Sequence, residues 1–220
     1  MQTTLLSIYA PTAQTTALAL LNANQVIAAP TDTVYGLMAR FDRQSAIEKL
    51  YEIKNRPTQR AIPVLIGNLN QLSYLTPTPV SDVARCLFDA FWPGALTVVL
   101  PALSSLLPIL TAHQPTIGVR MPDHPTLRAL IQVAGPLAAT SANRSGAADA
   151  HTAAEVLAQL GEQIPLLLTD ESINSATRNL QPSTIVDLTH SAEKAPRILR
   201  AGPIALAVKQ LLRAQFGYIC

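Results

Sequence analysis

Short apolar runs of strand length alternate with helical patterns through most of this 220-residue chain, and this alternation limits the fold more than any other feature. The runs of strand length cover residues 26–29, 62–66, 96–100, 116–120, 137–140, 166–169 and 184–188. Apolar residues recur with helical spacing over residues 15–22, 45–53, 80–91, 126–134, 152–160 and 204–214. Because parallel strands need long crossover connections, which are usually helices, this order predicts a layered α/β or α+β domain with a large, at least partly parallel sheet.

Two stretches interrupt the alternation. Residues 101–115 are punctuated by prolines, and residues 170–182 are polar and show no periodicity. We predict surface loops for both, and the second is long enough to form a lid. Gly135 and Gly161 lie just beyond two helical patterns, where we expect left-handed residues that end the helices. No repeat or linker divides the chain, so we predict one domain over residues 1–220.

The composition indicates a compact protein with an aliphatic core, because 49% of the residues are hydrophobic and only 14% are charged. The net charge is +2 and there are no runs of Lys and Arg, which argues against a dedicated nucleic-acid-binding arm. Residues 1–29 carry no positively charged leader, and no apolar stretch approaches the roughly 18 residues of a membrane span. We therefore expect a soluble, cytoplasmic protein.

Cysteine and histidine are too scattered to predict a disulfide or a metal centre. Cys86 and Cys220 lie far apart in the sequence, and Cys86 falls inside a helical pattern, where a free thiol packs as a small apolar group. The histidines have no metal-ligand spacing, so we expect surface side chains and no protein-bound metal. They are His113, His124, His151 and His190.

Residues 30–37 read Pro-Thr-Asp-Thr-Val-Tyr-Gly-Leu and directly follow the apolar run 26–29. Hydroxyl and carboxyl groups at the end of a strand are well placed to bind a ligand, because the sheet holds the strand while the loop carries polar groups. Thr and Asp are also ordinary turn and helix-capping residues. This octet alone supports both interpretations equally.

Cationic and hydroxyl-bearing residues stand at the ends of several predicted elements: Lys54, Arg56, Arg60, Arg120, Ser141, Asn143, Ser183 and Arg200. Each alone has an ordinary explanation; Lys54, for example, suits the negative end of a helix dipole. Gathered at one sheet edge they would suit a polyanion, because Arg offers paired donors, Lys a mobile charge and hydroxyls further hydrogen bonds. The chain has no P-loop, dinucleotide-binding or nucleophile-elbow motif, which disfavours those classes and covalent catalysis.

The order of several sequence blocks resembles that of the YrdC-type threonylcarbamoyl-AMP synthases. Besides the octet, the blocks are Lys54-Asn55-Arg56-Pro57, Ser141-Ala142-Asn143 and residues 61–66, 91–97, 118–122, 183–187 and 199–202. The match extends over about residues 12–205. It implies a YrdC-like α/β fold, with a twisted, mostly parallel or mixed sheet flanked by helices and a basic concave groove.

The resemblance implies an enzyme that makes L-threonylcarbamoyl-adenylate from L-threonine, bicarbonate or CO2, and ATP, with release of pyrophosphate. A separate transferase complex would then pass the threonylcarbamoyl group to the adenosine 3′ of the anticodon in tRNA. Mg²⁺ would enter with ATP and be held largely by phosphates and water, because no cluster of carboxylates is visible in the sequence.

The resemblance also implies roles for individual residues. Thr33, Arg120 and Ser183 match positions that hold L-threonine. The positions around ATP and its phosphates are matched by Lys54, Arg56, Arg60, Ser141, Asn143 and Arg200. Lys54 and Arg56 are the candidate catalytic residues, which would offset charge on the leaving pyrophosphate.

The chain departs from the family pattern at Asn55, where Gly is common, and in the loop 170–182, which lacks the usual glycines. Asn also adopts left-handed conformations, so the first change is tolerable. Two other functions stay open. One is a non-catalytic module that binds RNA weakly in the same groove; the other is a carbamoyl-adenylating enzyme of the hydrogenase-maturation type, against which the lack of acylphosphatase-like and zinc-finger regions speaks.

Overall fold

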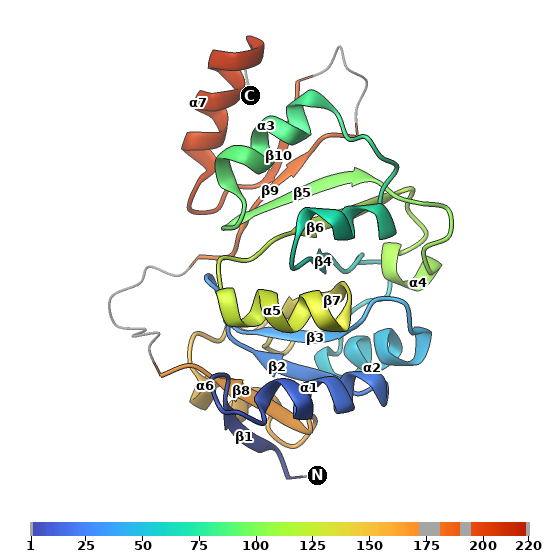
Figure 1. Cartoon of the computed structure of the whole chain (residues 1–220), viewed down its shortest axis with the longest axis vertical. Coiled ribbons are helices and arrows are strands. Elements are labelled where there is room, and N and C mark those ends of the chain that lie inside the picture. Colours follow the sequence, from blue (N-terminus) through green and yellow to red (C-terminus); the bar gives the residue numbers. More distant parts are fainter. Residues whose placement is uncertain (1, 172–180, 190–194, 219–220) are drawn as a thin grey trace.

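A computed structural model of the chain describes residues 2–171, 181–189 and 195–218. Its strands form one ten-stranded sheet in the order β1-β8-β2-β3-β7-β4-β6-β5-β9-β10 (Figure 1). The strands are β1 (Thr4–Ser7), β2 (Ile27–Ala29), β3 (Gly36–Arg40), β4 (Val64–Leu65), β5 (Leu96–Pro101), β6 (Thr116–Arg120), β7 (Leu137–Ser141), β8 (Leu166–Thr169), β9 (Thr184–Asp187) and β10 (Arg197–Arg200). The predicted α/β domain with a large sheet is confirmed.

The sheet is mixed and not mostly parallel. Parallel pairs join β1 to β8, β8 to β2, β4 to β6 and β5 to β9. Antiparallel pairs join β2 to β3, β3 to β7, β7 to β4, β6 to β5 and β9 to β10. The octet 30–37 therefore spans the turn between two antiparallel neighbours, β2 and β3, and is not the start of a helical crossover.

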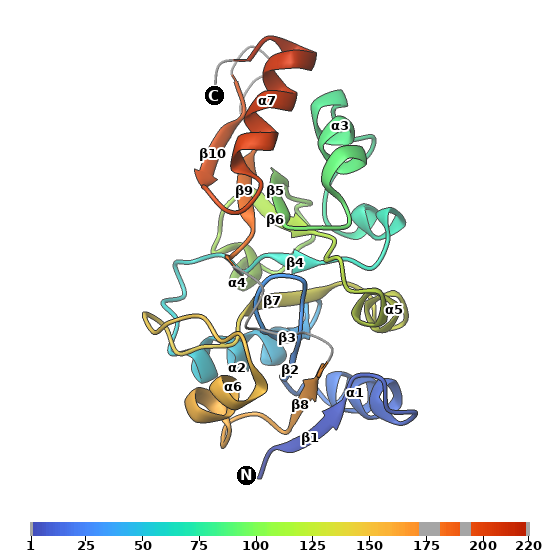
Figure 2. The same ribbon diagram turned by 90° about the vertical axis from the view of Figure 1, so that its left-hand side faces the viewer.

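Helices cover both faces of this sheet (Figure 2). They are α1 (Ala13–Asn22), α2 (Gln44–Lys54), α3 (Asp82–Phe91), α4 (Pro108–Thr111), α5 (Pro125–Ala134), α6 (Ala153–Leu160) and α7 (Ala205–Phe216), with a 3-10 helix, η1, at Leu69–Tyr74. All six predicted helices are present, with ends that differ by a few residues. The loop predicted over 101–115 contains the short helix α4.

The strand β2 shows how the two layers share one sheet. Ile27 and Ala29 pack with α1 and α5, whereas Val26 and Ala28 pack in the larger core that includes α2 and α6. Successive side chains of a strand point to opposite faces, so a strand covered on both sides must be apolar throughout. This is why the uninterrupted run 26–29 predicts a strand correctly.

Three strands are absent from the sequence-based prediction. The edge strands β1 and β10 are mostly exposed, and their short, mixed sequences carry no clear alternation. The central strand β3 reads Gly-Leu-Met-Ala-Arg, which lacks β-branched residues, and becomes a strand because β2 and β7 pair with it on both sides.

Several local expectations are wrong. Gly161 has a φ of −56°, and Gly135 combines a positive φ of 84° with a ψ of 176°, so neither glycine ends its helix in the left-handed helical conformation. His124 is not a surface residue: it is buried and its ring accepts a hydrogen bond from the Leu127 amide at the start of α5.

Other expectations fall outside the described residues: most of the predicted 170–182 loop (172–180), His190 and Cys220. Among the residues that the structure describes, no helix has the length and hydropathy to cross a membrane.

The N-terminus of α6 offers a test of the local design of the fold. Thr152 accepts from the Glu155 amide, and the Glu155 carboxylate accepts from the Thr152 amide in return. We expect Thr152→Ala to lower the free energy of unfolding by about 1 kcal/mol, because an amide at the helix start loses its acceptor. Urea denaturation measures the change. Thr152→Ser keeps the hydroxyl and should retain most of the stability; an equal loss in both variants would contradict the capping role.

Candidate functional site

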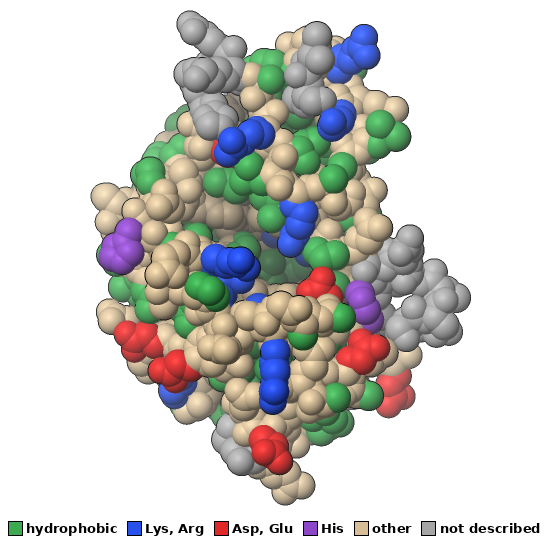
Figure 3. All heavy atoms as spheres, turned by 180° about the vertical axis from the view of Figure 1, so that it is seen from behind, with side chains coloured by type: hydrophobic (Ala, Val, Ile, Leu, Met, Phe, Trp, Pro, Cys, Tyr) green, Lys and Arg blue, Asp and Glu red, His purple; other side chains and the backbone are tan. Residues whose placement is uncertain are grey.

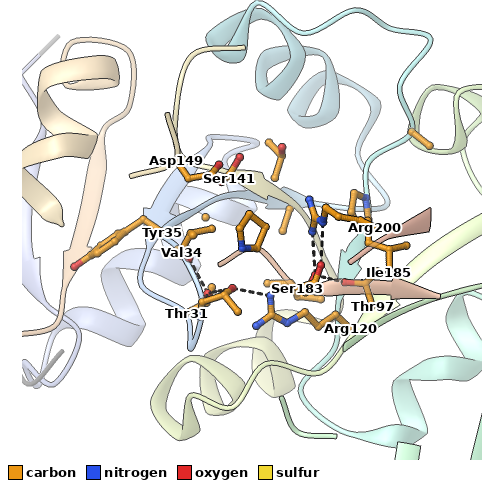
Figure 4. A pocket seen from close by; sticks show the side chains of 18 of the residues that line it. Thr31, Val34, Tyr35, Thr97, Arg120, Ser141, Asp149, Ser183, Ile185 and Arg200 are labelled. Atoms are coloured by element: carbon orange, nitrogen blue, oxygen red, sulfur yellow. Dashed lines mark hydrogen bonds between the residues drawn. The ribbon is translucent and has the colours of Figure 1, made fainter. Parts of the chain in front are cut away.

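A pocket opens where the turn between β2 and β3 faces the ends of the central strands (Figures 3 and 4). Figure 3 shows it as a hollow with Lys and Arg side chains around it and hydrophobic side chains inside. Its polar lining residues are Thr31, Thr33, Tyr35, Arg56, Thr97, Arg120, Thr140, Ser141, Asp149, Ser183 and Arg200. These residues come from most of the sheet, so the pocket exists only in the assembled fold.

The β2–β3 turn is held by its own threonines. The Thr31 hydroxyl donates to the Val34 carbonyl at 2.7 Å and accepts from the Thr33 amide at 3.1 Å. Both threonine side chains are buried, and their hydroxyl oxygens are 3.1 Å apart. Thr31 thus shapes the turn that presents Thr33 to the pocket, although Thr31 also lines it.

Arg120 fixes this turn to the end of β6. Its Nη1 donates to the Thr33 hydroxyl at 2.8 Å, its Nη2 to the Asp32 carboxylate at 2.6 Å and its Nε to the Gly94 carbonyl at 3.0 Å. The side chain is only 8% exposed, and burial lowers the pKa of Arg120 while the Asp32 carboxylate opposes that shift. The positive charge here is therefore paired within the protein.

Ser183 and Arg200 form the opposite wall. The Ser183 hydroxyl lies 2.7 Å from that of Thr97, and Arg200 donates from Nε to the Ser183 carbonyl at 2.9 Å and from Nη2 to the Ser183 hydroxyl at 3.2 Å (Figure 4). The turn after β10 approaches this wall closely. A Cβ at Gly202 would lie 2.4 Å from the Pro182 carbonyl oxygen, so only glycine allows the approach.

Lys54 ends α2 and points into the protein. Its ammonium lies 2.6–3.1 Å from four oxygens, the carbonyl and side-chain oxygens of Ser141 and of Asn143, which share its three N–H donors. Burial lowers the pKa of Lys54 to about 8; the Arg56 guanidinium adds to the shift, and the Asp149 carboxylate opposes it. Asn55 comes next and has a φ of 49°, so it adopts the left-handed conformation expected at a position where glycine is common. Lys54 therefore orders the turn that follows β7.

Arg56 lies in the pocket wall with part of its guanidinium occupied. Its Nε donates to the Arg60 carbonyl at 3.2 Å and its Nη2 to the Ala61 carbonyl at 2.9 Å. Burial lowers the pKa of Arg56. Arg60, in contrast, is exposed and contributes its backbone carbonyl to this arrangement.

The structure brings together most of the residues predicted from the sequence. Those that line the pocket are Thr33, Arg56, Arg120, Ser141, Ser183 and Arg200. Lys54 and Asn143 lie behind the Ser141 turn and bond to each other, and Arg60 lies outside the lining residues. Their predicted contacts with ATP stay predictions.

Other lining residues were not predicted. Thr97 lies within the block 91–97 and its hydroxyl could have been noticed. Tyr35 belongs to the octet 30–37, which the sequence marks as a candidate site, although Tyr35 itself was not singled out. Asp149 carried no signal as a pocket residue, because its placement depends on how the loop before α6 packs.

The chemistry available in the pocket is the binding of anions and of small polar groups. Arg56 and Arg200 present guanidinium groups beside the hydroxyls of Ser141 and Ser183. Among the described residues, no group of three or more His, Cys, Asp or Glu side chains could hold a metal ion. The fold and the pocket define a class of α/β proteins with a site at the ends of central strands that suits a polar, anionic ligand.

Comparison with known proteins gives the family. Residues 19–202 match the model of the Sua5/YciO/YrdC family, which carries the description "Telomere recombination". The chain belongs to this family.

Two curated relatives are named threonylcarbamoyl-AMP synthase. One, from Bacillus subtilis, is 48% identical over 132 residues, which cover 59% of this chain and 38% of the relative. Another, from Shigella flexneri, is 37% identical over 174 residues, which cover 78% of this chain and 88% of the relative.

The fold also resembles a solved structure, that of P. abyssi Sua5 complexed with L-threonine. The TM-score is 0.82 with 30% identity, and the match covers 91% of this chain and 57% of that one. The chain thus spans well under two thirds of the length of the Bacillus subtilis and P. abyssi relatives, but most of the Shigella flexneri relative.

The lowered pKa of Lys54 predicts how stability depends on pH. Between about pH 8 and pH 10 the unfolded chain still holds a proton that folded Lys54 has released, so the free energy of unfolding rises with pH. Relative to Lys54→Met, we expect the wild-type protein to gain up to about 3 kcal/mol across this range. Urea denaturation of both proteins at pH 7 and pH 10 measures the difference.

The exposed Lys209 provides the matched control, because Lys209→Met removes a lysine that lies outside the buried cluster. This variant should follow the wild-type protein at both pH values. A constant difference between wild type and Lys54→Met would show that Lys54 does not release its proton in this range.

Proposed function

We propose that this protein synthesises L-threonylcarbamoyl-adenylate from L-threonine, bicarbonate or CO2, and ATP, and releases pyrophosphate. The observation that carries the proposal is the pocket itself, in which paired and unpaired arginines and buried hydroxyls converge in a member of the Sua5/YciO/YrdC family. The names of the relatives and the L-threonine bound by the P. abyssi protein support it.

Two groups of pocket residues, which differ in charge, suit the two larger substrates. One group offers two hydroxyls, from Thr33 and Ser183, and the Arg120 guanidinium, whose charge is already paired with Asp32. This group suits L-threonine, which is a zwitterion with a hydroxyl. Arg56 and Arg200 have no carboxylate within hydrogen-bonding distance among the described residues, and so suit the phosphates of a nucleotide.

The proposed reaction needs positioning and charge neutralisation more than covalent help. The neutral amine of threonine adds to CO2 and gives a carbamate after loss of a proton; a carbamate oxygen then attacks the α-phosphorus of ATP, and the bond to pyrophosphate breaks. Arg56 is placed to offset charge on the leaving group. Lys54 would support the same step by holding the Ser141 turn.

The wider setting is part of the proposal. The product would serve a separate transferase complex that modifies the adenosine 3′ of the anticodon in tRNA, in the cytoplasm. Mg²⁺ would accompany ATP, since Mg²⁺ is usually held by substrate phosphates, water and one or two carboxylates.

The direct test is pyrophosphate release by the purified protein with L-threonine, bicarbonate, Mg²⁺ and ATP, together with mass detection of the adenylate. We expect release that depends on threonine and a product with the mass of threonylcarbamoyl-adenylate. No release above a control without threonine would refute the proposal. Salt-sensitive RNA binding in its place would favour the RNA-binding alternative.

Arg56→Ala should raise the KM for ATP by about ten- to hundredfold, because a hydrogen bond from a charged group to a phosphate is lost. The KM for threonine should change much less. Arg85 gives a matched control: it is exposed on α3 and paired with Asp82, so Arg85→Ala should behave as wild type. An unchanged KM for ATP in Arg56→Ala would remove Arg56 from the nucleotide site.

Thr33→Val should raise the KM for threonine by about tenfold, because it removes a buried hydroxyl and leaves Nη1 of Arg120 without its acceptor. Thr33→Ser keeps the hydroxyl and should stay within a few-fold of the wild-type value. Steady-state kinetics with threonine varied at saturating ATP measures both. If serine and valine have equal effects, the hydroxyl is not what the site uses.

A further inference from the structure

Asp149 is the only carboxylate among the described residues that line the pocket. The other acidic residue of this region, Asp32, forms an ion pair with Arg120. The structure gives Asp149 no hydrogen bond or ion pair with any described residue. Asp149 is half-buried and lies in the loop between β7 and α6. A carboxylate is thus exposed to a pocket whose other charged groups are cations.

The backbone holds Asp149 in this place. The next residue, Ala150, is fully buried, and its carbonyl accepts from the Tyr35 amide at 3.0 Å. Two residues further on, Thr152 begins the capping box of α6. The loop is therefore tied both to the β2–β3 turn and to a helix, and Asp149 faces the pocket as a built part of its wall.

A carboxylate in a site for a triphosphate has an electrostatic cost. Charges of the same sign repel each other at these distances, and the effect is larger where protein replaces water. The cost is removed if the ligand brings a cation to the carboxylate. The proposed substrates bring two cations: the ammonium group of threonine and the Mg²⁺ that accompanies ATP.

The position of Asp149 favours the second of these. Burial lowers the pKa of both Lys54 and Arg200, and the Asp149 carboxylate opposes the shift in each case, so it lies within electrostatic range of both. Arg120 has Asp32 as its counter-charge. Figure 4 shows Asp149 well apart from Arg120 and Thr31, toward the end of the pocket where Ser141 lies.

We propose that Asp149 faces the divalent cation of Mg–ATP and makes the pocket select the magnesium complex over free ATP. The inference rests on the proposed function and names the form of the nucleotide that this chain accepts. One carboxylate together with phosphates and water is a common environment for Mg²⁺, so the residues present fit the ion. Without Mg²⁺, the same carboxylate repels the triphosphate.

The test compares the Kd for ATP in EDTA with that in saturating Mg²⁺, measured by calorimetry for wild type and Asp149→Asn. In EDTA we expect the variant to bind ATP about three- to tenfold more tightly, because one like-charge repulsion is gone. In Mg²⁺ we expect it to bind more weakly than wild type. Mg²⁺ should therefore strengthen ATP binding strongly in the wild type and much less in the variant.

Two further proteins complete the design. Glu162→Gln removes one negative charge from an exposed side chain outside the pocket lining and should match wild type in both buffers. Asp149→Ser gives a smaller neutral residue and should repeat the effect of Asn. Thermal melting confirms that each variant folds.

Other outcomes would overturn the inference. Equal weakening in both buffers would show that Asp149 holds an uncharged part of the nucleotide. A change confined to the Kd for threonine would assign Asp149 to the ammonium group. Failure of the wild-type protein to bind ATP in either buffer would remove the proposed function itself, whereas normal binding with an unchanged Mg²⁺ effect would remove this inference alone.

Discussion

The burial of the Arg120 guanidinium is the interaction on which the site depends. Arg120 ends β6, and its Asp32 and Thr33 partners lie in the turn that enters β3, although β7 and β4 separate these strands in the sheet. An uncompensated charge in this position would cost several kcal/mol, so the turn must keep Asp32 in place. Arg120, which lies outside residues 30–37, thereby fixes the conformation of that turn.

Because Asp32 compensates Arg120, the two sides of the pocket differ in charge although both contain arginine. Near Thr33 the local charge is balanced, and recognition rests on hydroxyls and directed donors. Near Arg56 and Arg200 no carboxylate is hydrogen-bonded to the guanidinium groups among the described residues. Because the two sides differ in charge, a zwitterion would favour one side and a polyanion the other.

Sequence predicts the parts of this structure that follow from local pattern. Both faces of β2 are covered, so every residue of the strand must be apolar. The uninterrupted apolar run 26–29 therefore predicts this strand. Strand β3 has no such mark, since Gly-Leu-Met-Ala-Arg becomes a strand only between β2 and β7. Edge strands such as β10 have one partner and few buried residues, so their pattern is equally weak.

The same limit applies within the site. Arginines at the ends of predicted elements indicate an anion site from the sequence alone; here they are Arg56, Arg120 and Arg200. The sequence did not show that Lys54 points inward, because that direction depends on the turn at Asn143, which is far away along the chain. Asp149 likewise gains meaning only from the loop that packs Ala150 against Tyr35.

The arginines that remain for the ligand are oriented in advance. Arg56 and Arg200 each use their Nε and one terminal nitrogen on protein oxygens. A guanidinium has five N–H donors in a fixed plane, so these bonds fix the plane and leave further donors for the pocket. When a ligand binds these arginines, their side chains lose less entropy than those of freely rotating arginines would. The protein thus orders these cations during folding, and the proposed reaction would need no further reorganisation of them.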